Sequence, residues 1–164
     1  MNLDNLKLEI DNIKNKTNEL SNLVSLFEKV ILIGNGGSNA MASHISVDYT
    51  KFLNKKSFSF SDAPMLTAYI NDYGRDEAYK QFLKNFVDGN TLVILISSSG
   101  NSMNVVNAAK WCEANNVTYA ALSGFGANNK LNSLNADYKF WVDAKSYGVV
   151  EIAHETLLHS IIDN

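Results

Sequence analysis

The sequence lacks several features that define large classes of protein. Its 164 residues include a single cysteine, so no intrachain disulfide framework can form. No apolar run approaches the length needed to cross a bilayer. The acidic and polar residues spread through the first 25 positions are unlike a secretory signal. We therefore expect a cytoplasmic protein that makes no contact with a membrane.

The sequence also lacks an excess of basic residues. Its formal net charge is -3 at pH 7, which gives no general electrostatic footprint for nucleic acid, so we expect no nucleic-acid partner. With 46% hydrophobic residues and no linker, the chain can bury one sizeable core. We expect a single domain over residues 1–164.

Both common nucleotide-binding signatures are missing from the glycine-rich segment at residues 34–37. It has no GK[ST] sequence, and Asn39 stands where the dinucleotide fingerprint has its third glycine. The segment nevertheless joins an apolar run, Val30–Ile33, to a helical segment that Ser38 is expected to cap. Glycines there permit positive φ and close backbone approach, and amides and a helix dipole converge on such a turn. The turn predicts an anion site, with a sugar phosphate as the more natural ligand and no nucleotide cofactor.

A second loop has a similar design. Thr91–Ile96 predicts a buried parallel strand, and a helix is expected at Met103–Glu113, with Cys112 in its apolar face and therefore in the core. Four serines lie at the start of that helix: Ser97, Ser98, Ser99 and Ser102. An isolated serine-rich loop serves most often as a cap and turn. Two such loops after two strands favour the binding of one phosphate by hydroxyls and amides.

Strands and helices alternate along most of the chain. Further strands are expected at Ser57–Phe60, Val117–Leu122 and Tyr138–Val142, and further helices at Pro64–Asn71, Asp76–Val87 and Gly148–Asp163. This order predicts an α/β fold in which helices cover both faces of a parallel sheet. Ligand-binding loops then lie at the carboxyl ends of the strands.

One long amphipathic helix is expected within residues 1–29. Its seam repeats in steps of three and four and consists of Leu3, Leu6, Ile10, Ile13, Thr17, Leu20, Val24 and Phe27. Such a seam needs a partner, which is either another helix of the same chain or a neighbouring subunit. We favour the subunit, so that residues 1–29 serve in oligomer packing.

Two groups of ionisable residues are candidates for chemistry. His44 and Asp48 are four residues apart and share one helix face, where they can act as acid, base or metal ligands. The last helix carries Glu151, Glu155 and His159 at the same spacing. Any one of these residues alone is as well explained as part of a solvated face. The apolar neighbours in the last helix argue against free exposure.

Taken together, these motifs resemble the phosphoheptose isomerases, a family with the sugar isomerase (SIS) fold. The matching segments are GNGGS at 34–38, ISSSGNS at 96–102, LSGFG at 122–126 and ExxHxxxxH at 151–159, with His44 and an acid at 48. The resemblance implies a three-layer SIS-type α/β domain. It also implies an aldose-ketose isomerase that converts D-sedoheptulose 7-phosphate to D-glycero-D-manno-heptose 7-phosphate through an enediol, for lipopolysaccharide or capsule heptose. Members are usually homotetramers with active sites between subunits.

The resemblance assigns roles to individual residues. Asp48 stands for the family's glutamate base, one methylene shorter, and His159 for its general acid. The substrate-binding residues that it implies are Asn35, Gly36, Gly37, Ser38, Asp72, Ser97, Ser98, Ser99, Ser102 and Glu151. The metal ligands that it implies are His44, Asp48, Glu151 and His159. This mixed nitrogen and oxygen set suits zinc better than magnesium, although a hydrogen-bonded acid-base cluster needs the same four residues.

The chain departs from the family at several places. Glu151 replaces a glutamine, and residues 146–150 replace an Asp-x-x-Arg-like stretch, so we expect the distal hydroxyls of the substrate to be read differently. The rival interpretation is a non-enzymatic SIS protein, either a sugar-phosphate sensor or an adaptor of the replication initiator. The shortened carboxylate at 48 fits that alternative, whereas His159 and the complete serine loop fit an enzyme.

Overall fold

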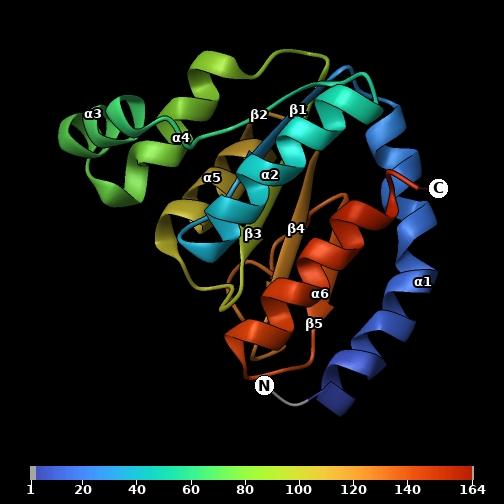
Figure 1. Ribbon diagram of the computed structural model, residues 1–164. Helices are drawn as coiled ribbons and strands as arrows, with labels where there is room; N and C mark the ends of the chain where they lie inside the picture. Colours follow the sequence, from blue (N-terminus) through green and yellow to red (C-terminus); the bar gives the residue numbers. More distant parts are fainter. Residues whose placement is uncertain (1–2, 164) are drawn as a thin grey trace.

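The computed structural model describes residues 3–163, which form one α/β unit around a central sheet (Figure 1). The sheet has five parallel strands in the order β2-β1-β3-β4-β5. The strands are β1 (Lys29–Ile33), β2 (Lys56–Ser59), β3 (Thr91–Ser97), β4 (Tyr119–Gly124) and β5 (Tyr138–Val142). The helices are α1 (Leu3–Ser25), α2 (Gly37–Phe52), α3 (Ala63–Tyr73), α4 (Arg75–Phe86), α5 (Met103–Ala114) and α6 (Tyr147–Ser160). The predicted parallel α/β sheet is therefore confirmed.

Helices cover both faces of the sheet because its strands are apolar on both sides. In β1, Val30 and Leu32 join a core cluster with α1, α2 and α6, whereas Ile31 and Ile33 join a second cluster with α3, α4 and α5. This alternation is the ordinary consequence of the two-residue period of a strand. The order of the strands reverses between β1 and β3, so the loops after these two strands are neighbours at the carboxyl edge.

The long helix α1 packs against its own chain. It lies beside α6, as Figure 1 shows, and the hydroxyls of Thr17 and Ser160 are 2.8 Å apart. Of its seam, Leu20 and Val24 are buried in the core, but Leu3 and Ile10 remain 67% and 38% exposed. One of the two expected partners, a helix of the same chain, is thus present. The contact with another subunit stays a prediction.

The start of α2 differs from the sequence prediction. Gly36, with φ 53, is the N-cap residue, and no side chain caps the helix. Ser38 lies inside the first turn and is buried, because the chain enters the helix directly after the positive-φ turn at Gly36. A Cβ at Gly34 would lie only 2.7 Å from the Cβ of Ser38, so a glycine is needed there for the turn to close. The expected capping role of Ser38 was wrong.

The described helices include none that is long and apolar enough to span a bilayer. Cys112 is buried in the second core cluster, where burial raises the pKa of its thiol to about 12. The prediction that this cysteine belongs to the core is confirmed.

Candidate active site

A pocket of about 260 Å³ opens at the carboxyl edge of the sheet, where β1 and β3 end. Its lining comes from the glycine turn, the serine loop and the start of α6, and consists of Asn35, Gly36, Gly37, Ser38, Ile96, Ser97, Ser98, Ser99, Ser102, Tyr147 and Glu151. The structure therefore brings together both loops that the sequence analysis selected. Tyr147 was not foreseen, because the position of the first turn of α6 is set by tertiary packing.

Three helices begin at this pocket. Gly37 is the first residue of α2, Ser102 is the N-cap of α5, and Tyr147 is the first residue of α6. None of the three N-cap residues makes a side-chain capping bond. Some first-turn amides have acceptors nearby, since Asn39 donates to the Gly36 carbonyl and Val105 to Oδ1 of Asn104, and the others are left for a ligand. No lysine, arginine or histidine lines the pocket. Attraction for an anion comes instead from amides, hydroxyls and the positive ends of three helix dipoles.

One hydroxyl of the serine loop has no partner within the described chain. Ser98 is only 5% exposed, and its Oγ makes no hydrogen bond, whereas Ser97 Oγ donates to Ser102 Oγ at 3.2 Å. A buried polar atom without a partner is costly, and such atoms in native proteins call for an explanation. Ser98 also lines the pocket, so a bound phosphate is a candidate acceptor for this hydroxyl.

A buried asparagine fixes the shape of the serine loop. Gly100 adopts φ 63, and a Cβ there would lie 1.8 Å from Oδ1 of Asn129. The Asn129 amide in turn donates to the carbonyls of Gly124 and Gly126 at 3.1 and 2.9 Å. The LSGFG segment thus holds the serine loop against the end of β4 through two of its backbone carbonyls.

The glycine turn is held by a second network. The hydroxyl of Tyr79, on α4, lies 2.7 Å from the Gly34 carbonyl and 2.8 Å from Asn35 Oδ1, and its single proton is shared between them. Asn35 and Asn104 also exchange hydrogen bonds through their side-chain amides, at 3.0 and 2.9 Å. Burial raises the pKa of Tyr79 to about 12, so its hydroxyl remains a donor at neutral pH. The side chain of Asn35 therefore orients the turn, a role that its sequence position alone did not indicate.

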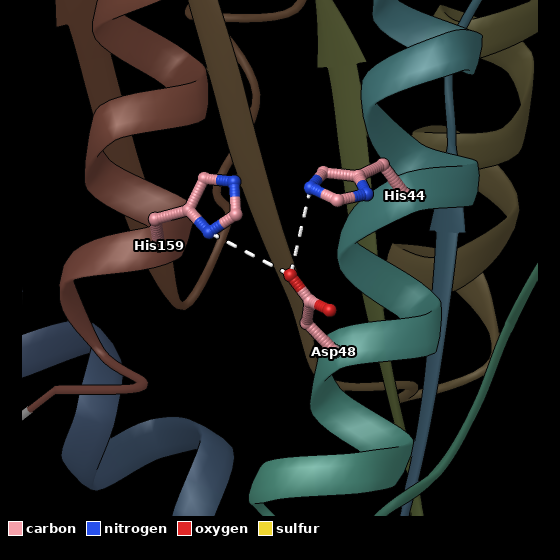
Figure 2. A group of neighbouring side chains, drawn as sticks. All are labelled: His44, Asp48 and His159. Carbon is pink, nitrogen blue, oxygen red and sulfur yellow. Dashed lines mark ion pairs between the residues drawn. The ribbon is translucent and has the colours of Figure 1, made fainter.

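The second part of the site is a cluster of one carboxylate and two imidazoles (Figure 2). Asp48 Oδ2 lies 3.5 Å from His44 Nε2 and 3.8 Å from His159 Nδ1. His44 and Asp48 project from α2 and His159 from α6, so residues more than a hundred positions apart meet across the two helices. One ligand atom from each residue lies within 4.8 Å of the others, which is close enough for all three to bind one metal ion.

Glu151, the fourth predicted ligand, is not part of this close group. It precedes His159 by eight residues on α6, which corresponds to about 12 Å along the helix axis. Its carboxylate lies over the start of α2, where a Cβ at Gly37 would be 2.8 Å from both carboxylate oxygens. The structure thus joins three of the four predicted ligands and places Glu151 at the pocket.

A second pocket, of about 310 Å³, lies beside the first. Its lining is Gly37, Ala40, Met41, His44, Glu151, Ile152 and Glu155. It shares Gly37 and Glu151 with the serine pocket and His44 with the cluster. An extended ligand that occupies both pockets would therefore have one end among the serines and the other beside His44.

Asp72 is the predicted site residue that this chain places elsewhere. It lies exposed on α3, where its Oδ1 accepts a hydrogen bond from Asn71 Nδ2 at 3.0 Å, and it does not line either pocket. Its role near a substrate stays a prediction.

Comparison with known proteins agrees with this arrangement. The SIS domain family model matches residues 3–124. The phosphoheptose isomerase of Fusobacterium nucleatum is 31% identical over 150 residues, which cover 88% of this chain and 76% of that protein. That of Sulfurimonas denitrificans is 33% identical over 165 residues, with coverage of 94% and 84%.

The fold agrees as well. The solved structure of the phosphoheptose isomerase from Neisseria gonorrhoeae superposes with a TM-score of 0.87 at 24% identity, and covers 98% of this chain and 90% of that one. Fold, loops and sequence identity lead to the same group of proteins. This chain belongs to the SIS domain family and, within it, to the phosphoheptose isomerases.

Proposed function

We propose that this protein is an isomerase that converts D-sedoheptulose 7-phosphate to D-glycero-D-manno-heptose 7-phosphate. The observation that carries the proposal is the arrangement of two sites along one groove. A pocket with three helix starts and an unpartnered serine hydroxyl shares Gly37 and Glu151 with a neighbouring pocket, and that second pocket is lined by His44 of the carboxylate and imidazole cluster. The phosphate binds in the serine pocket, and the reacting carbons lie near the cluster.

The reaction moves a proton between adjacent carbons. In this proposal the Asp48 carboxylate removes a proton from C1 of the ketose, and the C1-C2 enediol forms as the carbonyl oxygen O2 takes up a proton. His159 moves the proton between O1 and O2, and the acid form of Asp48 then returns a proton to C2. The product aldehyde contains the same atoms as the ketose, so no other reactant is needed. The 3.8 Å separation between Asp48 Oδ2 and His159 Nδ1 supports these paired roles.

We propose zinc as the cofactor, held by His44, Asp48 and His159. The two nitrogens and one oxygen suit this ion, and a bound zinc supplies a Lewis acid that polarises the substrate carbonyl. Glu151, predicted both as a ligand and as a substrate-binding residue, fits the second role better, because its carboxylate lies at the pocket and can accept hydrogen bonds from sugar hydroxyls. Elemental analysis of protein purified without chelator tests the metal.

We further propose that the enzyme is a cytoplasmic homotetramer that supplies heptose for lipopolysaccharide or capsule. Exposed apolar side chains on α1 and α2 support the assembly: Leu3, Leu8, Ile10, Val47 and Phe52. Phosphorylated sugars are intermediates of the cytoplasm, which supports the location.

Incubation with D-sedoheptulose 7-phosphate in deuterated water, followed by NMR, tests the function. We expect the aldose product to form and deuterium to enter the substrate carbons, and we expect both to disappear in Asp48→Asn. A wild-type protein that binds the sugar phosphate but neither converts it nor exchanges its C-H protons is a sensor or adaptor, and this outcome overturns the proposal.

A further inference from the structure

Tyr147 is the aromatic residue of the serine pocket and has no assigned role. It is the first residue of α6 and is 60% exposed, although it lines the same pocket as Ser97 and Ser98. It does not line the second pocket, which leads toward His44. Tyr147 therefore belongs to the end of the groove where the phosphate is expected, and the lining there contains no cationic side chain.

The residue against which Tyr147 packs has an unusual backbone. Phe125 has φ 59, and the other non-glycine residues with positive φ in the described part of the chain are two asparagines, Asn54 and Asn116. Asparagine tolerates this conformation, whereas a bulky aromatic residue is strained in it. Such strain persists only where the surrounding structure imposes it, and it gathers at functional sites.

Two contacts impose the conformation of Phe125. Its backbone N-H donates to the carbonyl of Ala144 at 3.0 Å, just before the turn that leads into α6. The preceding residue, Gly124, packs tightly against α6, since a Cβ at Gly124 would lie 2.6 Å from Cγ2 of Val150. The end of β4 and the first turn of α6 are therefore locked together, and Phe125 is held beside the start of that helix.

The consequence of this lock is a defined position for the tyrosine ring. The rings of Phe125 and Tyr147 pack edge to face, with centroids 4.9 Å apart and an interplanar angle of 65°. Without this contact, an exposed tyrosine at the first position of a helix would populate several rotamers. The strained phenylalanine thus restricts the tyrosine at the mouth of the pocket.

We propose that Tyr147 is a substrate-binding residue whose hydroxyl donates a hydrogen bond to the phosphate in the serine pocket, and that Phe125 is its positioning residue. The identity of the sugar rests on the proposed function, but the contact itself requires only a phosphate group. A tyrosine hydroxyl is a suitable donor here, because a hydrogen bond to a charged oxygen is strong and the lining has no lysine or arginine to supply one.

Steady-state kinetics with three variants test the proposal. We measure kcat and KM for D-sedoheptulose 7-phosphate and the inhibition constant of inorganic phosphate. Tyr147→Phe keeps the ring and removes the hydroxyl. Phe125→Asn removes the ring but keeps a residue that accepts positive φ. Tyr138→Phe is the control, because the Tyr138 hydroxyl donates to the Lys16 carbonyl, away from the pocket.

Tyr147→Phe is expected to raise both KM and the phosphate inhibition constant by about tenfold, the usual effect of losing one hydrogen bond to a charged group, with kcat little changed. Phe125→Asn is expected to raise both constants by a smaller factor, and Tyr138→Phe to leave them unchanged. A rise in KM without a rise in the phosphate constant overturns the assignment to the phosphate, and unchanged constants in Tyr147→Phe overturn the whole inference.

Direct titration of wild type and Tyr147→Phe with inorganic phosphate separates this inference from the proposed function. If the protein has no isomerase activity but Tyr147→Phe binds phosphate about tenfold more weakly, the function fails and the inference stands. Equal phosphate affinity of the two proteins contradicts the inference whether or not the protein is an isomerase.

Discussion

The carboxylate of Asp48 lies between two imidazoles that belong to different helices. One of its oxygens is 3.5 Å from His44 and 3.8 Å from His159. The pair within α2 was predictable from the sequence, because residues four apart share a helix face. The approach of His159 was not predictable from spacing, since it depends on the packing of α6 against α2. It was obtained from the family resemblance alone.

The position of this carboxylate gives the first prediction. Asp48→Asn keeps the shape but removes the base, so kcat should fall by about 10² to 10⁴ while the affinity for phosphate remains. Asp48→Glu restores the family residue and should retain activity, because it keeps a carboxylate base at this position. Rates from a coupled assay, with phosphate titration as control, check both variants. An active Asp48→Asn would assign the base elsewhere.

A second residue-scale prediction concerns His154. It is fully buried, its Nε2 donates to the Ser123 carbonyl at 3.1 Å, and its Nδ1 has no partner in the described chain. Burial lowers its pKa to about 4, against 6.5 in the unfolded chain, so below pH 6.5 the unfolded state binds the proton first. The stability that neutral His154 contributes should therefore be lost as pH falls from 6.5 toward 4, by about 1.4 kcal/mol per pH unit.

Urea denaturation of wild type and His154→Gln at several pH values measures this contribution. The variant does not titrate, so the difference in unfolding free energy between the two proteins should change over that window and stay constant above pH 7. A difference that is the same at pH 5 and pH 7 would contradict the lowered pKa.

At the scale of elements, the loops were easier to predict than their surroundings. The apolar run of β3 and the four serines after it are local features, and both were found as expected. The start of α2 at Gly37 was missed because the positive φ of Gly36, rather than a serine cap, begins the helix. Tyr147 was missed because nothing in its local sequence indicates that α6 begins at the pocket.

The serine loop gives a prediction in which stability and binding separate. Ser98→Ala removes a buried hydroxyl that has no hydrogen-bond partner in the described chain, so the unfolding free energy should stay the same or rise by up to about 1 kcal/mol. KM should rise about tenfold, because in the proposed site this hydroxyl donates to the bound phosphate. Thermal unfolding and kinetics check the two effects. Ser133→Ala, at a hydroxyl that donates to the Asn129 carbonyl, is the control, and should destabilise without any effect on KM. Destabilisation in Ser98→Ala with unchanged KM would count against the phosphate pocket.

At the scale of the whole molecule, one question is what covers the exposed part of the apolar seam of α1. The sequence predicted the helix and its seam, and the chain itself buries the C-terminal part of that seam against α6 and β5. The N-terminal part of the seam remains exposed. The surface of a second copy that would cover it cannot be predicted from the periodic pattern, because the pattern describes one helix and not the contacts between chains. Substitution of the exposed apolar residues at the start of α1 can therefore test for an assembly.

We predict that the wild-type protein is a homotetramer and that Leu3→Glu combined with Ile10→Glu reduces its mass in light scattering. Both side chains continue the apolar seam, and Leu3 in particular is 67% exposed in the single chain, so a charge there opposes association more than folding. Asn15→Glu adds one negative charge at an exposed polar position of α1 and should leave the mass unchanged. A wild-type monomer at micromolar concentration would contradict the assembly. A tetramer that persists in the double variant, with an unchanged circular dichroism spectrum, would move the contact to another face of the molecule.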